Sequence, residues 1–153
     1  MLGVSSYPQD YIDYCRESVR RQVAAYEDLM AAARGAASGD AAGVEGAIEA
    51  FEPRFFNNMV LVLDACFVHR LRKTEGKDGN PLSEVRVLCA SLLTNDGVLG
   101  KDSQIKLKPE TSVLGLSVGD EIRIAHDDFV RLADAFFSEL EARFVEAAVP
   151  AGR

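Results

Sequence analysis

The residues best suited to binding chemistry are basic and lie close together near the middle of the chain. They are His69, Arg70, Arg72, Lys73 and Lys77. An arginine side chain can donate two parallel hydrogen bonds to a phosphate or a carboxylate. The glycine-containing loop that follows could bring backbone N–H groups to the same anion. We therefore predict an anion-binding site that includes His69, Arg70, Arg72 and Lys77.

The same basic residues also have a purely structural interpretation. Cations in the last turn of a helix stabilise the helix dipole, and the apolar segment before them predicts a helix that ends here. The loop sequence GKDGN does not have the GxxxxGK[ST] pattern of a P-loop. The sequence alone leaves both interpretations open.

Two polar residues inside the apolar segment could belong to the same site. Asn57 and Asp64 are seven residues apart, so they share one stripe of a helix. A buried carboxylate without a partner is very costly. Asp64 is therefore expected either to pair with an arginine of another helix or to line a ligand pocket, with Asn57 beside it.

The remaining sequence patterns give little indication of a metal site or a catalytic nucleophile. The two histidines, His69 and His126, have no HxxxH or ExxH spacing. The three cysteines have no CxxC or Cys/His spacing for zinc, and no GxSxG pattern occurs. We expect no metal and no cofactor. No catalytic residue can be named, and the sequence favours a protein that is not an enzyme without deciding the question.

A long apolar segment, residues 53–73, must position the basic cluster. Pro53 suits the first turn of a helix, and the side chains that follow are apolar on more than one face, which is typical of a buried helix. The apolar run from Met59 to Val68 carries Asp64 and is too short for a membrane span, which needs about 20 apolar residues. The segment predicts a buried central helix.

The first helix is predicted to start just after Ser6, with Pro8 in its first turn, because Ser6 and Gln9 have the spacing of a capping box. Its apolar residues recur at steps of three and four as far as about Arg34. This seam is longer than the central helix alone can cover. We therefore expect part of it to contact a second subunit in a homodimer.

The remaining elements are expected to pack around the central helix. A helix over 40–52 should end at Pro53, another should cover 80–94, and the last should cover 126–144. Between the last two, apolar and charged residues alternate at 105–108 and 121–124, which predicts two antiparallel strands. The sequence therefore predicts a mainly α fold of about five helices with a small β-hairpin.

Length and charge limit the possible functions. The 153 residues fit one domain, 1–153, with frayed ends at 1–6 and 147–153. The formal net charge of −7 makes broad neutralisation of nucleic-acid phosphates an unsuitable function. The odd number of cysteines predicts reduced thiols and a cytoplasmic location, and the N-terminus does not have the pattern of a signal peptide.

Two functions fit these observations. The first is a non-enzymatic binding or interaction protein, homodimeric through the first helix, that could also take a protein partner. The second is a ligand-binding or enzymatic module for an anionic small molecule or a nucleic-acid end, which would use the basic cluster. The sequence favours the first.

Overall fold

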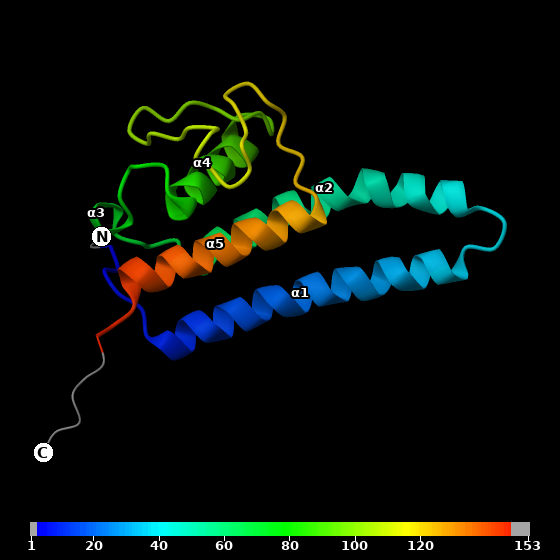
Figure 1. The fold of residues 1–153 in the computed structure, drawn as a ribbon, viewed down its shortest axis with the longest axis horizontal. Coiled ribbons are helices and arrows are strands. Elements are labelled where there is room, and N and C mark those ends of the chain that lie inside the picture. Colours follow the sequence, from blue (N-terminus) through cyan, green and yellow to red (C-terminus); the bar gives the residue numbers. More distant parts are fainter. Residues whose placement is uncertain (1–2, 148–153) are drawn as a thin grey trace, which may run out of the picture.

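Two long helices, α1 (Gln9–Ala36) and α2 (Ala41–Ala65), run antiparallel and form a hairpin along the whole molecule (Figure 1). The helix α5 (His126–Phe144) packs against both of them, and α4 (Pro81–Thr94) packs against α2 and α5. This computed structural model describes residues 3–147. The expected mainly α fold is confirmed. Residues 1–2 and 148–153, which belong to the ends expected to fray, lie outside the described part.

The first helix follows its predicted seam. The buried side chains of α1 are spaced by three and four residues: Ile12, Cys15, Val19, Val23, Tyr26 and Met30. The predicted capping box is wrong, because Pro8 is the N-cap residue and no side chain caps the helix. The helix start is held by tertiary contacts, as the Tyr7 N–H donates to the Phe144 carbonyl over 2.6 Å.

Residues 3–6, part of the lead-in 1–6 that the sequence predicts to be loose, and Tyr7 are bound to two other segments. Val4 pairs with Arg70 in a parallel bridge, and its N–H donates to the carbonyl of His69 over 2.7 Å. Tyr7 pairs in the same way with Val145. The chain before α1 therefore covers the turn after α2 and the end of α5.

The predicted boundaries of the central helix are wrong at both ends. Pro53 lies inside α2, so the two helices expected on either side of it are one continuous helix. A proline inside a helix costs about 3 kcal/mol. The buried seam that continues through this position, from Ile48 to Phe56 and Leu63, outweighs that cost. At its other end the helix stops at Ala65, and residues 72–75 form a separate single turn, α3 (Arg72–Glu75).

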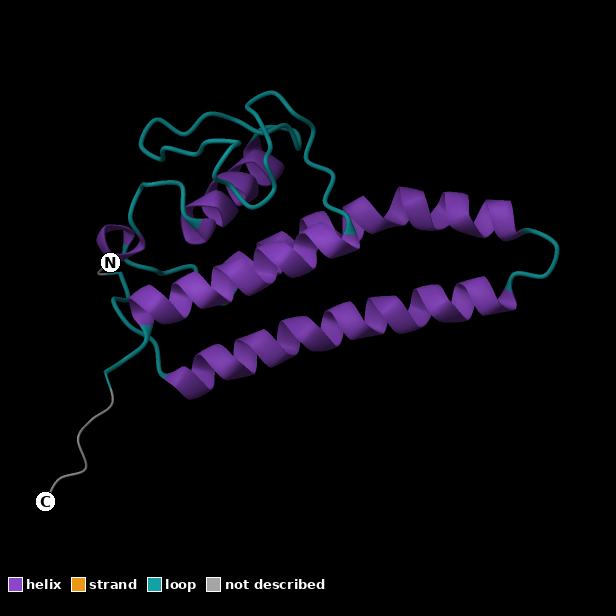
Figure 2. Ribbon diagram, in the orientation of Figure 1, coloured by secondary structure: helices purple, strands orange, loops and turns teal. Residues whose placement is uncertain are grey.

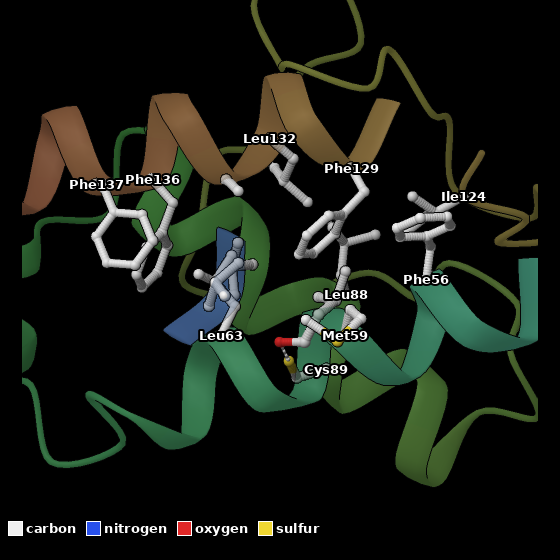
Figure 3. Close-up of a cluster of buried hydrophobic side chains, with 14 of the residues drawn as sticks. Phe56, Met59, Leu63, Leu88, Cys89, Ile124, Phe129, Leu132, Phe136 and Phe137 are labelled. Atoms are coloured by element: carbon white, nitrogen blue, oxygen red, sulfur yellow. Dashed lines mark hydrogen bonds between the residues drawn. The ribbon is translucent and has the colours of Figure 1, made fainter. Parts of the chain in front are cut away.

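The helices share one apolar core, in which α2, α4 and α5 meet (Figure 3). Phe56 and Leu63 of α2 face Phe129 and Phe136 of α5, and all four are fully buried. Cys89 of α4 donates a weak hydrogen bond from its Sγ to the Val60 carbonyl over 3.5 Å. Burial raises the pKa of the Cys89 thiol to about 12, so this thiol stays protonated and unreactive.

The predicted β-hairpin is wrong. Residues 3–147 contain isolated bridges such as Val98 with Glu121 but no strand, and the chain from 95 to 125 lies over α4 as a long irregular segment (Figure 2). The alternation did predict burial correctly, because Ile105, Ile122 and Ile124 are buried. Their backbone groups are bonded to side chains and to loops, so no strand ladder forms.

Asn57 of α2 is one of the residues that replace the ladder. Its Nδ2 donates to the carbonyl of Ile122 over 2.8 Å, and its Oδ1 accepts from the N–H of Ile124 over 3.1 Å. Glu84 of α4 does the same for the middle of the segment. Its two carboxylate oxygens accept from the N–H groups of Val113 and Leu114 over 2.8 and 3.0 Å.

We expect Asn57→Ala to lower the free energy of unfolding by about 2 kcal/mol. The change removes both hydrogen bonds and leaves a partly buried donor and acceptor unpaired. Asn58→Ala is the matched control, because Asn58 is adjacent and exposed, and it should change stability by less than about 0.5 kcal/mol. Urea denaturation measures both. Equal effects of the two substitutions would contradict the anchoring role of Asn57.

Candidate functional site

Arg70, the centre of the predicted anion site, is inside the protein. Its side chain is 0% exposed. Its guanidinium donates to the carbonyls of Phe67 and Leu82 over 3.1 and 3.3 Å and to Oε1 of Glu75 over 3.1 Å. The same group lies over the ring of Phe136, 5.3 Å from the centroid. Both terminal nitrogens therefore bind protein groups, and Nε is buried without a partner within residues 3–147, so the guanidinium is closed to an external anion.

Two carboxylates surround this guanidinium. Oδ1 of Asp64 lies 3.0 Å from Nη1 of Arg70, an ion-pair contact. Glu75, whose side chain is 1% exposed, also accepts from Arg86 of α4, at 2.9 Å from Nε and 2.7 Å from Nη2. The partner of Asp64 is thus an arginine from the turn just after α2, and not from another helix. Such a buried pair is tolerated only with good geometry and further hydrogen bonds, which Glu75, Arg86 and the carbonyls supply.

The six residues predicted to form one site do not come together. Arg70 and Asp64 form the buried cluster with Glu75 and Arg86. Asn57 holds the irregular segment, as described above. The other three, His69, Arg72 and Lys77, lie on the surface. The basic pattern in the sequence therefore combined one structural arginine with surface cations.

Lys106, which the sequence did not associate with the basic cluster, lies beside Lys77. The backbone N–H of Lys106 donates to the carbonyl of Lys77 over 2.8 Å, which joins the loop after α3 to the irregular segment. All five lysines of the chain fall between residues 73 and 108, a bias that sequence inspection can find. None of the ion pairs within residues 3–147 involves a lysine.

A second group of ionisable residues forms where α5 starts beside α1. His126 contacts Oε1 of Glu27 through Nε2 at 2.6 Å and Oδ1 of Asp127 through Nδ1 at 2.7 Å. Its ring stacks on Tyr26 at 6.2 Å between centroids. These residues border a hollow of about 360 Å³ that also includes Glu52. Glu27 and His126 are 99 residues apart, so spacing along the chain could not reveal this contact.

The pKa of His126 depends on two opposing effects. Burial lowers it, but the hydrogen bonds to Asp127 and Glu27 outweigh burial and raise the pKa above the ordinary 6.5. Histidine is the side chain that binds or releases a proton near neutral pH, and here two carboxylates contact its ring. In this position the protonated ring ties α5 to α1.

Comparison with known proteins gives no assignment. No protein-family model, no curated protein and no solved structure matches this chain.

Within residues 3–147, no group of three or more histidine, cysteine, aspartate or glutamate side chains is arranged to hold a metal ion. The helices of the same part of the chain are too short or too polar to cross a membrane.

We expect Arg70→Ala to lower the free energy of unfolding by about 3–5 kcal/mol, because it leaves Asp64 without its cation and removes the donor to Glu75 and to two backbone carbonyls. Arg72→Ala is the matched control, two residues away and exposed, and should cost less than about 0.5 kcal/mol. Thermal and urea denaturation measure both effects. A stable Arg70→Ala protein would show that the buried cluster does not hold the fold.

We also expect the stabilisation that His126 contributes to be lost as pH rises above 6.5. The folded state holds the His126 proton more tightly than the unfolded chain does. The stabilisation is therefore complete below the ordinary pKa of 6.5 and is lost as pH rises through the raised pKa. His126→Gln should remove this dependence, whereas His69→Gln should keep it. Urea denaturation at a series of pH values decides, and identical profiles for the two variants would refute the role of His126.

Proposed function

We propose that this protein is a non-enzymatic binding protein that associates with a second copy of itself through the α1–α2 hairpin. The observation that carries the proposal is a pair of exposed apolar side chains on facing helices. Leu29 of α1 is 60% exposed and Phe51 of α2 is 44% exposed. Large apolar side chains that remain in water on neighbouring elements are typical of an interaction surface.

The two side chains lie on the same region of the hairpin. Tyr26 precedes Leu29 by about one helical turn, which places the two residues close together along α1. The ring of Tyr26 stacks on Phe51 at 6.4 Å between centroids, with an angle of 14° between the ring planes. Phe55 continues this aromatic group along α2. A partner that covers Leu29 would therefore reach Phe51 as well.

The distal part of the hairpin is open to a partner. It extends beyond the start of α5, as the cyan end of the ribbon in Figure 1 shows. Arg34 and Glu45 join the two helices near the tip, with Nε 2.6 Å from Oε1. Gly35 and Gly46 have no other atom within 4 Å of the position a side chain would take, so another helix could approach closely there.

The surface proposed for self-association is not the α1 seam expected from the sequence. The long seam of α1 needs no second subunit, because the extended α2 covers it within the same chain, with Ile48 and Met30 both buried. The proposed contact is instead the outer surface. Two hairpins related by a two-fold axis would form a four-helix arrangement, and two-fold dimers are the commonest oligomers. The three free cysteines suit a reducing compartment, so we place this assembly in the cytoplasm.

The double substitution Leu29→Glu/Phe51→Glu should convert a dimer into a monomer while the helices stay folded, because both side chains are already exposed. Leu93→Glu on α4 is the matched control, as Leu93 is 69% exposed on a different surface. Light scattering coupled to size exclusion measures the mass of each protein. A wild-type protein that is monomeric at high micromolar concentration would refute the proposal, and so would loss of the dimer in the control.

A further inference from the structure

The irregular segment and α4 enclose a hollow that none of the functions above uses. Its volume is about 410 Å³, within the range of about 300–1,000 Å³ that is usual for small-molecule sites. We propose that this hollow binds a small amphipathic anion, namely a carboxylate attached to an apolar chain. The proposal goes beyond self-association, since it concerns a different surface and a different kind of ligand.

One part of the hollow is apolar. Val87 of α4 contributes to it together with Leu99, Ile105, Leu107 and Leu116 of the segment. Val87, Leu99 and Ile105 are buried, and Val118 at the edge is 63% exposed. An apolar ligand chain would remove from water the area that Leu107, Leu116 and Val118 still expose, which is favourable by about 25 cal/mol per Å².

The rest of the hollow is cationic. Lys101, Lys106 and Lys108 line it, and all three are exposed. A lysine ammonium is a compact charge on a flexible stem, so several lysines can converge on one small head group.

The residues that line the hollow include one carboxylate, Asp102. Asp102 accepts from the N–H groups of Gln104 and Ile105 over 2.7 and 3.0 Å. These bonds hold its pKa below the ordinary value. Within residues 3–147, none of the three lysines that line the hollow takes part in an ion pair, in a protein whose net charge is −7.

The hollow has a fixed frame. The Leu99 N–H donates to the Asp120 carbonyl over 2.8 Å, and the Leu99 carbonyl accepts from Gly119 over 2.9 Å, which closes the segment on itself. The bond from Lys106 to Lys77 and the two bonds from Glu84 hold the rest. A site that exists before binding loses little conformational entropy when the ligand enters. The apolar part favours a carboxylate with a chain over free phosphate or acetate.

Isothermal titration calorimetry with three probes separates charge from apolar contact. Decanoate has both features, decyltrimethylammonium has the same chain with the opposite charge, and acetate has the charge alone. All are used below the concentration at which they form micelles. We expect decanoate to bind and decyltrimethylammonium to bind at least about tenfold more weakly, because each charge-assisted contact is worth about tenfold or more. Acetate should give no measurable heat. Equal binding of the two decyl probes, or no binding of decanoate, would overturn the proposal.

Variants locate the site on the protein. Lys106→Gln/Lys108→Gln should weaken decanoate at least about tenfold, and Val118→Asp should weaken it similarly by repelling the carboxylate. Lys73→Gln is the matched control, an exposed lysine that does not line the hollow. Melting curves without probe confirm that each variant is folded. Unchanged binding in both test variants would overturn the proposal. The Leu29→Glu/Phe51→Glu protein should bind decanoate like the wild type, so failure of self-association leaves this test intact.

Discussion

The guanidinium of Arg70 is the group on which the arrangement of the smaller elements depends. It reaches Asp64 at the end of α2, Glu75 in α3 and the Leu82 carbonyl in the first turn of α4. A charge in an apolar interior must be matched almost completely to be tolerated. The residues around Arg70 are therefore confined to positions where they can supply oxygen atoms. Arg70 thereby ties the end of α2, the turn α3 and the first turn of α4 to one another.

The position of α4 in turn determines the irregular segment. A connection of about 30 residues without a strand ladder must satisfy its backbone groups in some other way. Glu84 supplies two acceptors from α4, and Asn57 supplies a donor and an acceptor from α2. Burial raises the pKa of Glu84, and the hydrogen bonds that it accepts from the backbone N–H groups of Leu114 and Val113 lower the pKa in part. Polar side chains on helices thus hold a segment that apolar packing alone would leave loose.

The sequence was informative where one rule acted alone. The periodic seams of α1 and α5 and the Asn80–Pro81 start of α4 were predicted, because burial of one helical stripe or one capping residue decides each of them. Predictions from the sequence were wrong where the local pattern is overridden by contacts with residues far along the chain. Pro53 reads locally as a helix break, yet the seam from Ile48 to Leu63 continues through it. The alternation around Ile105 and Ile122 reports burial, but whether it forms strands depends on partners that lie far along the chain.

The candidate sites show the same limit. A cluster of basic letters could not reveal that Arg70 is buried while Arg72 is exposed, since that depends on where Glu75 and Phe136 lie. The chain does separate its charges along its length, with all five lysines in 73–108 and six acidic residues against one arginine in 27–52. The two proposed binding surfaces, the hairpin and the lysine-lined hollow, lie in these two differently charged parts of the protein.

Native-state hydrogen exchange of the amides between α2 and α4 tests most directly whether the buried cluster holds this region. The N–H groups of Arg70, Thr74 and Glu75 donate to carbonyls of Phe67 and Leu71 over 3.0–3.1 Å. If the Arg70 cluster fixes the turn, these amides should exchange only through global unfolding, as slowly as the core amides of α5. Exchange at the rate of an exposed loop would show that the turn opens independently, and would contradict the role assigned to Arg70.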